Sequence, residues 1–340
     1  MTTPIAPAQS PEGDVPVRRI TPGMTADVAV ATALLGFLDT IEHNVPGTIE
    51  DRDPEFLHDL RVAVRRTRSL IKLAGDVLPA PLAERYAPRF KWLGDLTTPT
   101  RDLDVYLLRL NDLAEWLVGA EGDDLDPFAE HVRRQRSKSR RSLVRGLRSQ
   151  RFSSLCRNWR TALTAVVDGR AGMDASADPA GQRSRSAPVT VEHLAADRVR
   201  HAYKRVLRRA QVITPDSPAE QIHALRKRCK ELRYILEVFE PVCAPGKHRS
   251  VVKRLKRVQD VLGDFQDGEV QSAALRSFAQ QMLDDDPPPA ATLLAMGELS
   301  ARFTAQQHQA RLSLTAALPR LVGANTHSRI EAMLPARTLA

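Results

Sequence analysis

Residues 58–73 read HDLRVAVRRTRSLIKL, and residues 223–238 read HALRKRCKELRYILEV. A shift of 165 residues lays the segment 58–105 onto 223–270 without a gap, and ten of these 48 positions are identical. Most of the identities are charged residues or histidines, whereas a repeat kept only for its fold would preserve its apolar core first. The sequence therefore predicts a duplicated unit in which both copies keep a functional surface.

Apolar residues recur with a period close to 3.6 along almost the whole chain, and there is no convincing run of alternating β-branched residues. This pattern predicts an all-α protein, and the repeat predicts two halves related by a pseudo-two-fold axis. In the first half we expect helices near 24–43, 54–77, 81–97, 102–119, 127–149 and 152–167. In the second half we expect helices near 190–212, 218–240, 247–262, 267–283 and 290–317.

Stretches rich in proline and small polar residues divide the chain, because such segments bury too little apolar surface to fold. Residues 1–23 have this composition and predict a disordered tail, and GRAGMDASADPAGQRSRSAP at 169–188 predicts a linker over 169–189. The expected domain organisation is then a first helical half over 24–168, a second over 190–318 and a C-terminal tail over 319–340.

The first repeat places a row of basic residues directly beside its apolar face. At 100° per residue, the row falls within an arc of about 80° on one helix. The second repeat keeps the same register. Equal charges one turn apart repel by a few tenths of a kcal/mol per pair, so a row that adjoins the core indicates the wall of a groove that holds an anion. The two rows are His58, Arg61, Arg65, Arg68 and Lys72 in the first repeat, and His223, Arg226, Lys230 and Arg233 in the second.

Charged residues near the rows allow two interpretations. Glu237 stands where the first repeat has Lys72, and it can end the basic row or pair with Arg233 at i,i+4. Four further repeated cations are candidates for the same groove: Arg89, Lys91, Arg254 and Lys256. The two lysines among them have an aspartate four residues later, so an ordinary salt bridge is an open alternative for each. Asp102 and Asp104 resemble residues that begin a helix.

Two other helices carry basic residues. The expected helix over 190–212 adds Arg198, His201, Lys204, Arg205 and Arg208, of which we take His201, Arg205 and Arg208 as candidate ligands of the anion; a plain surface row is the alternative. A dense run from Arg133 to Arg141 has the pattern of a solvated helix face, and we leave it outside the site.

Composition narrows the function classes. The formal net charge is +9, which favours anionic partners, and aromatic residues make up only 5% of the chain, which disfavours the stacking platforms of single-strand nucleic-acid binders. The three cysteines have no metal-ligand spacing, and the chain lacks the glycine-rich, nucleophile and metalloprotease motifs of common enzymes. No apolar run is long enough to span a bilayer. We therefore expect a cytoplasmic, non-catalytic protein without a metal or other cofactor.

The two histidines of the rows each lie one turn from an arginine, a setting that disfavours a bound cation. Beside a phosphate the imidazole is a donor. We expect affinity for a phosphate-bearing polyanion to rise from about pH 8 to about pH 6 as His58, His201 and His223 gain protons, since the reference pKa is about 6.5.

With these residues in view, the chain resembles the CHAD family, the conserved histidine α-helical domain. The resemblance rests on the two quoted stretches and on FKWLGDLTTPTRDLDV at 90–105 and LKRVQDVLGDFQDGEV at 255–270, and it covers roughly 24–318. It implies a pseudo-two-fold helical unit with a basic central groove, affinity for inorganic polyphosphate, and association with polyphosphate granules. The ExExK motif of the CYTH domain, which many relatives carry, is not found, so we expect a stand-alone binder. The glycine turn expected at Gly263 is replaced by Thr98 in the first repeat.

The function expected from the sequence is non-catalytic binding of inorganic polyphosphate in a basic groove. Two alternatives stay open, a nucleic-acid-binding basic helical protein and an accessory or regulatory subunit of a polyphosphate-metabolising enzyme. Nucleic acid would be better supported by stacking residues or by Asn and Gln on a recognition helix. The oligomeric state is not indicated by the sequence.

Overall fold

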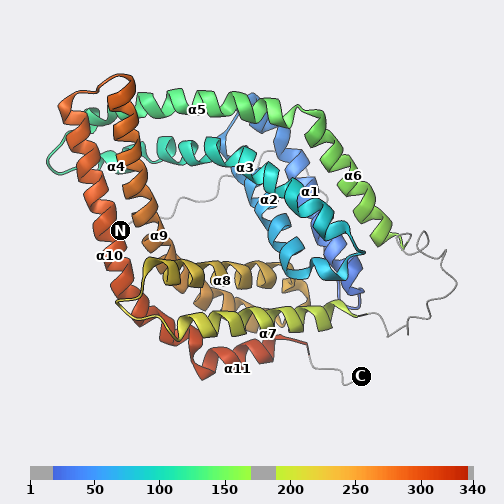
Figure 1. The fold of residues 1–340 in the computed structure, drawn as a ribbon. Helices are drawn as coiled ribbons and strands as arrows, with labels where there is room; N and C mark the ends of the chain where they lie inside the picture. The colour runs from blue at the N-terminus through green and yellow to red at the C-terminus, as the bar shows by residue number, and fades with distance from the viewer. Residues whose placement is uncertain (1–17, 170–188, 336–340) are drawn as a thin grey trace.

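The computed structural model describes residues 18–169 and 189–335, and almost all of them are helical (Figure 1). No β-strand occurs within these two ranges. The fold is therefore all-α, as the apolar periodicity predicts. None of the helices in the described ranges is both long enough and apolar enough to cross a membrane.

Each half is a bundle with the same order of helix contacts. In the first half α1 packs on α2, α2 on α3 and α3 on α5, and in the second half α7 packs on α8, α8 on α9 and α9 on α10. The first-half helices are α1 (Ala26–Glu50), α2 (Pro54–Ala74), α3 (Leu82–Leu108), α4 (Leu110–Ala114), α5 (Asp126–Leu147) and α6 (Gln150–Val167), with the 3-10 turns η1 (Gly75–Val77) and η2 (Gly122–Leu125). The second-half helices are α7 (Val191–Ala210), α8 (Ala219–Val238), α9 (Pro245–Asp285), α10 (Ala290–Val322) and α11 (Ala324–Met333), with the 3-10 turn η4 (Glu240–Val242).

Local sequence explains where α2 begins and which faces of α2 and α8 are buried. Asp53 caps α2 by accepting a hydrogen bond from the Glu55 amide at 2.8 Å, and Pro54 occupies the first helical position. The apolar faces expected beside the basic rows are buried in both helices. Their buried residues include Leu57, Leu60, Val64 and Ile71 in α2, and Ile222, Leu225, Cys229, Leu232 and Leu236 in α8.

The turns expected in the middle of α3 and α9 are wrong, because each segment is one continuous helix. Gly263 lies inside α9, and Asp102 and Asp104 lie inside α3 and do not begin a helix. A proline inside a helix costs about 3 kcal/mol. In α3 that cost at Pro99 is offset by the burial of neighbouring side chains such as Leu93 and Leu103.

Both ends of the described ranges extend beyond the expected halves. The C-terminal tail expected from 319 is wrong as far as residue 335, because α10 continues to Val322 and α11 buries Ile330 and Met333 against α9. Within the expected N-terminal tail, Ile20 is buried in the core. The rest of that tail, residues 1–17, and most of the expected linker, residues 170–188, lie outside the described ranges.

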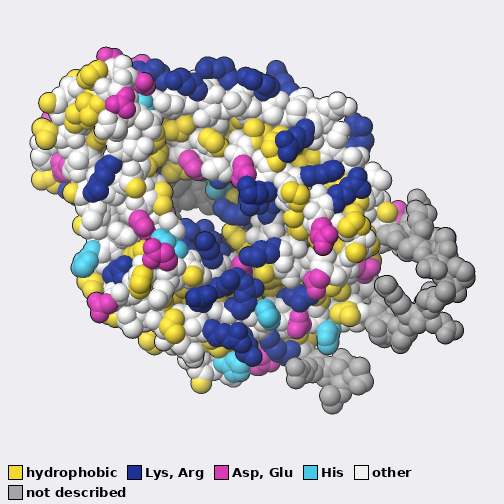
Figure 2. Space-filling view, in the orientation of Figure 1, with side chains coloured by type: hydrophobic (Ala, Val, Ile, Leu, Met, Phe, Trp, Pro, Cys, Tyr) yellow, Lys and Arg dark blue, Asp and Glu magenta, His cyan; other side chains and the backbone are white. Residues whose placement is uncertain are grey.

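The two halves meet at two places. One is the crossing of α2 and α8 within the main core. The other is a second core at the far end, where the ends of α3 and α9 pack with the starts of α5 and α10. Contacts at two separated places leave an opening between them, and Figure 2 shows that opening in the middle of the molecule with Lys and Arg side chains at its border.

Candidate polyanion-binding site

A cavity of about 340 Å³ is lined by residues of α2, α8 and α9. We call it the junction cavity. Both repeats contribute basic side chains to its lining. His58, near the N-terminal end of α2, also lines it. The lining cations are Arg65, Arg66, Arg226, Lys230 and Arg233, and the lining carboxylates are Glu237 and Asp260.

Two ion pairs cross from α2 to α8 and show how the repeats meet. Arg66 Nη2 lies 3.2 Å from Glu237 Oε2, and Lys72 Nζ lies 2.7 Å from Glu231 Oε1. The 165-residue shift converts Arg66 into Glu231 and Lys72 into Glu237, so the two pairs are related by the pseudo-two-fold axis itself. The two repeats thus differ at these positions, which are basic in α2 and acidic in α8. The resulting ion pairs stabilise the crossing of two helices that are otherwise both basic.

Three cations of the junction cavity have no ion-pair partner within the described ranges: Arg65, Arg226 and Lys230. The Arg65 guanidinium lies over the Tyr234 ring, 5.9 Å from its centroid. Burial, together with the nearby charges of Arg226 and Arg65, lowers the pKa of Lys230 to about 8. The same cavity thus concentrates positive charge that a bound polyanion would balance.

The repeated arginines Arg61 and Arg226 each have a repeated aspartate on the adjoining long helix. Arg61 Nη2 lies 3.9 Å from Asp102 Oδ1, and Arg61 also donates a 2.7 Å hydrogen bond to the Thr98 hydroxyl. Burial lowers the pKa of Arg226, and the charge of Asp267 partly opposes that shift. Each repeated arginine therefore has a repeated aspartate near it, but only Arg61 lies within ion-pair distance of its aspartate.

His58 is a hydrogen-bond donor toward the cavity while neutral. Arg101 Nη2 lies 2.9 Å from His58 Nδ1, and because a guanidinium only donates, Nδ1 must be the acceptor and Nε2 must carry the proton. Burial and the Arg101 charge lower the pKa of His58 below its usual value of 6.5. The ring can thus offer an N–H to an anion without being protonated.

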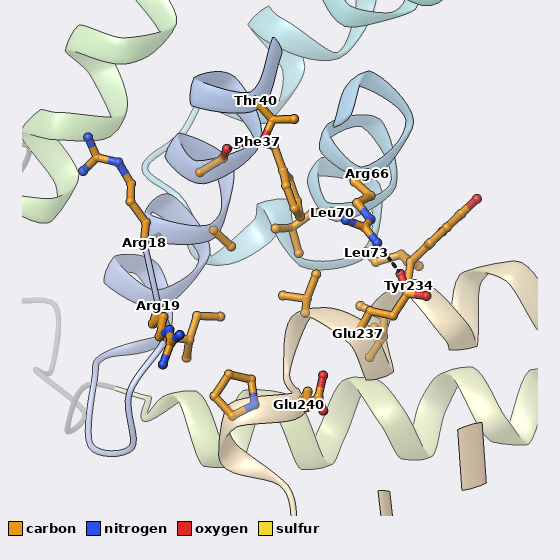
Figure 3. A pocket seen from close by; sticks show the side chains of 16 residues that line it. Arg18, Arg19, Phe37, Thr40, Arg66, Leu70, Leu73, Tyr234, Glu237 and Glu240 are labelled. Atoms are coloured by element: carbon orange, nitrogen blue, oxygen red, sulfur yellow. Dashed lines mark hydrogen bonds and ion pairs between the residues drawn. The ribbon is translucent and has the colours of Figure 1, made fainter. Parts of the chain in front are cut away.

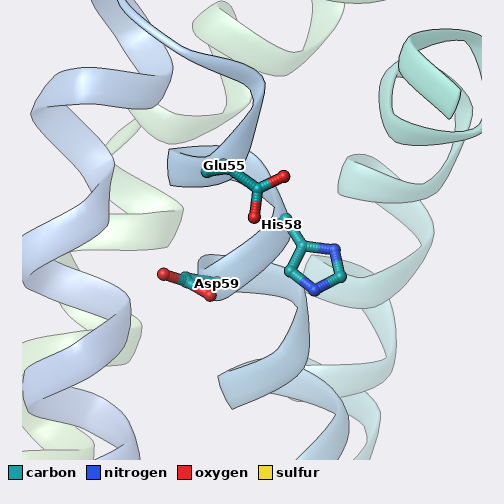
Figure 4. Close-up of side chains that lie close together, drawn as sticks. All are labelled: Glu55, His58 and Asp59. Carbon is teal, nitrogen blue, oxygen red and sulfur yellow. The ribbon is translucent and has the colours of Figure 1, made fainter. Parts of the chain in front are cut away.

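His58 also belongs to a group of three side chains with ligand atoms within 4.8 Å of one another, Glu55, His58 and Asp59 (Figure 4). The Arg101 guanidinium contacts two of them, His58 Nδ1 and, at 3.7 Å, Glu55 Oε1. A positive charge at this position opposes a metal cation and occupies one of the two imidazole nitrogens, Nδ1. The arrangement favours an anion-facing histidine over a metal ligand.

His223 has a different environment from its repeat partner. Its Nε2 lies 2.8 Å from Glu269 Oε2, its ring packs on Phe265, and it is not among the residues that line the junction cavity. The difference follows from the repeat, since Arg101 is replaced by Gln266 and Asp104 by Glu269. The two histidines therefore do not have equivalent roles.

The remaining candidates of α2 and α3 lie outside the cavity lining. Lys72 is paired with Glu231, and Lys91 Nζ lies 2.6 Å from Asp95 Oδ2, which is the salt bridge that the spacing allowed. The Arg89 guanidinium lies over the Tyr86 ring at 5.1 Å. Arg68 extends across Gly94, where its Nη1 would lie 2.8 Å from an added Cβ.

The candidates on α7 are also separated from the cavity. Arg205 Nη2 lies 3.0 Å from Glu231 Oε2, so its charge is balanced within the fold. Glu231 also pairs with Arg228 at 2.7 Å as well as with Lys72, and its side chain is only 12% exposed. His201 and Arg208 are exposed on α7. Helix α7 therefore stabilises the α2–α8 crossing through Arg205, and none of its described residues lines the junction cavity.

Arg254 and Lys256 lie close together in α9 but have different surroundings. Arg254 lines a separate cavity of about 610 Å³ with Lys253, Arg257 and Arg320, and it donates a 3.3 Å hydrogen bond to the Thr326 hydroxyl of α11. Lys256 is exposed and lines neither cavity. The four repeated cations of α3 and α9 therefore do not line the junction cavity; they are Arg89, Lys91, Arg254 and Lys256.

A larger cavity of about 980 Å³ lies on the other side of the Arg66–Glu237 pair (Figure 3). Its walls are largely apolar, with Phe37, Leu70 and Leu73 among the lining side chains. Two of its three arginines are paired, Arg66 with Glu237 and Arg18 with Asp39. The balanced charge makes it a poorer polyanion site than the junction cavity.

Some residues of the site were missed by the sequence analysis. Arg66, Tyr234 and Gln259 line the cavity, and Arg101 fixes the tautomer of His58. The repeat does contain a signal for Arg66, because two basic positions of one copy, 66 and 72, are acidic in the other. Arg101 has no such signal, since its partner position is occupied by Gln266.

Two curated relatives come from different strains of Mycobacterium tuberculosis and are described as "Uncharacterized protein Rv2226" and "Uncharacterized protein MT2285". Each is 32% identical over 219 residues, which is 63% of this chain and 38% of the relative. The matched part of this chain therefore spans well under half the length of those relatives.

Two solved structures share the fold. The crystal structure of the CHAD domain from the plant Ricinus communis matches 91% of this chain and 97% of that chain, with a TM-score of 0.72 and 24% identity. PptA from Streptomyces chartreusis matches 87% of this chain and 99% of that chain, with a TM-score of 0.57 and 18% identity. The family description "CHAD domain" matches residues 32–276, the greater part of the sequence. The chain belongs to the CHAD-domain family.

Proposed function

We propose that this protein binds inorganic polyphosphate in the junction cavity, without catalysis, and that this binding associates it with polyphosphate granules. The observation that carries the proposal is the meeting of Arg65, Arg226 and Lys230 from both repeats in one cavity without ion-pair partners among the described residues. A chain of phosphates brings negative charge to each of them at once.

The chemistry of the lining favours polyphosphate over nucleic acid. Arginine presents a fork of donors that suits phosphate oxygens, and the His58 Nε2–H adds a neutral donor. Tyr234 is the single aromatic residue of the lining, and the Arg65 guanidinium already lies over its ring. The lining formed by the described residues therefore offers little aromatic surface on which a base could stack, whereas an unbranched phosphate chain needs none.

Titration across a salt series tests this function. Purified protein is titrated with polyphosphate and with duplex DNA of equal charge, and log K is plotted against log salt concentration. Both affinities should fall linearly through counterion release, and polyphosphate should bind more tightly throughout. Equal or tighter binding of DNA at physiological salt would replace the polyphosphate proposal by the nucleic-acid one.

A further inference from the structure

Helix α5 carries a second set of cations on the outer side of the molecule. They recur at steps of four, three, four and three residues, which places them in one straight row along the helix. At a rise of 1.5 Å per residue the row is about 21 Å long. We call this row the α5 ridge, and it consists of Arg134, Lys138, Arg141, Arg145 and Arg148.

The opposite side of α5 explains why the ridge faces outward. Arg136 bridges Asp51 and Asp104, and Arg140 pairs with Asp51 and donates a hydrogen bond to the Ile49 carbonyl. These contacts tie the inner side of α5 to α1 and α3. The run of basic residues expected as one solvated face is therefore divided into an inner, paired row and the outer ridge.

All five residues of the ridge are exposed, and none forms a side-chain hydrogen bond or ion pair within the described ranges. Figure 2 shows dark blue side chains in a nearly continuous line over α5, on the rim that faces away from the central opening. Like charges one turn apart destabilise a helix by a few tenths of a kcal/mol per pair. The favourable interaction of cations with a helix C-terminus offsets this only in the last turn, at Arg145 and Arg148.

We propose that the α5 ridge is a second polyphosphate site, so that one molecule joins two polyphosphate chains. The inference rests on the proposed function of the junction cavity. Ser137, Ser142 and the partly buried Gln135 flank the ridge, and none of its own five side chains is an aromatic or amide group that could read a base. The ridge thus offers charge in a line, which suits a second chain of the same polymer.

Two separate sites on one molecule have a measurable consequence. Chains too short to reach from the cavity to the ridge bind as two per molecule. Long chains are cross-linked by the protein, and the mixture scatters light most strongly when neither component is in excess. The cavity alone gives one short chain per molecule and little scattering.

The test uses three variants of the full chain with circular dichroism and melting as folding controls. The ridge variant changes Arg134, Lys138, Arg141, Arg145 and Arg148 to Gln. Its matched control changes five exposed cations elsewhere to Gln, so that the net charge falls equally; these are Arg157, Arg209, Lys247, Arg249 and Arg276. The cavity variant carries Arg65→Gln, Arg226→Gln and Lys230→Gln.

For each variant, calorimetry measures how many short polyphosphate chains bind per molecule, and light scattering measures cross-linking of long chains. The ridge variant should bind one short chain in place of two and lose scattering by about fivefold or more, while the control stays within about twofold of the unaltered protein. Unchanged stoichiometry and scattering in the ridge variant, or equal losses in the control, would overturn the inference. The same variants are also titrated with duplex DNA, and a ridge variant that loses only DNA binding would overturn the inference and make the ridge a nucleic-acid surface. If the cavity variant still binds two short chains, the proposed function fails instead.

Discussion

Lys230 and His58 line the same cavity, but they respond to pH in different ranges. The pKa of Lys230 is lowered to about 8 by burial and neighbouring arginines, and that of His58 is lowered below 6.5 by burial and Arg101. At neutral pH, Lys230 is therefore charged and His58 is neutral. The pH dependence of binding above about pH 8 should therefore come from Lys230, and any contribution from protonation of His58 should lie at lower pH.

Polyphosphate affinity should fall as the pH rises above about 8. A bound polyanion raises the pKa of Lys230, so the polymer binds the protonated lysine more tightly and loses affinity where free Lys230 is deprotonated. The loss is up to about tenfold per pH unit between the free and bound pKa values. Calorimetry from pH 6.5 to about 9.5 measures it. Lys230→Arg keeps the charge and should flatten the curve; an equally steep curve in this variant would exclude Lys230 as the cause.

His58 should contribute through its neutral Nε2–H. His58→Leu removes this donor and should weaken binding by about 1 kcal/mol, roughly fivefold, while His58→Gln can replace the N–H and should lose less. Affinity is measured at pH 7.5 and pH 6.5. A rise in affinity between these values that disappears in His58→Gln would instead show that the ring acts as an imidazolium.

At the scale of elements, the crossing of α2 and α8 depends on acids of the second repeat. Glu231 is the common partner of Lys72, Arg205 and Arg228, which come from α2, α7 and α8. Glu237 serves Arg66 and Arg233, and the second of these pairs has the i,i+4 spacing recognised in the sequence. Two acids thus hold together two helices whose basic rows repel each other.

Glu231→Gln should destabilise the fold, because it leaves three cations without their common carboxylate. A loss of about 1 to 3 kcal/mol in the free energy of unfolding is expected. Urea unfolding measures it, with Glu130→Gln on the exposed side of α5 as the control, which should change stability by less than about 0.5 kcal/mol. Similar values for both variants would mean that the Glu231 contacts contribute little to the crossing.

The sequence predicts elements and rows well where the decisive pattern is local. The apolar period fixes the helices, and the register of the rows predicts that Arg65, Arg226, Lys230 and Arg233 share one surface. The helix ends expected near 97 and 262 are wrong: Pro99 and Gly263 are poor helix formers, yet both lie inside continuous helices because tertiary packing overrides such local preferences. At Gly268 an added Cβ would lie 2.6 Å from the Phe303 carbonyl, so this glycine allows α9 and α10 to approach closely.

Candidates that depend on long-range packing were not separable by sequence. Arg254 and Lys230 are both repeated cations beside apolar positions, yet α9 carries Arg254 toward α10 and α11 and away from the junction cavity. Arg205 and Arg226 likewise look similar on a helical wheel. Only the fold shows that Glu231 already neutralises Arg205, whereas Arg226 has no ion-pair partner in the described ranges.

At the scale of the whole molecule, the duplication brings residues of both repeats into one cavity. The halves meet at the α2–α8 crossing and again at the second core. Part of each row lines the cavity at that crossing, namely His58 and Arg65 of the first repeat and Arg226, Lys230 and Arg233 of the second. Arg65 and Lys230 occupy equivalent positions of the repeat, and each acts electrostatically on the other inside one cavity. A polyanion in that cavity therefore contacts both halves at once.

The most direct test compares polyphosphate affinity in two triple variants of equal net charge. One removes the cavity cations through Arg65→Gln, Arg226→Gln and Lys230→Gln, and the other carries Arg157→Gln, Arg249→Gln and Arg276→Gln at exposed positions elsewhere. Each charged contact is worth about 1 to 3 kcal/mol, so the cavity variant should lose about a hundredfold or more in its affinity for short chains at the junction cavity. The surface variant should stay within about threefold. Equal losses in the two variants would contradict a site at the junction of the halves.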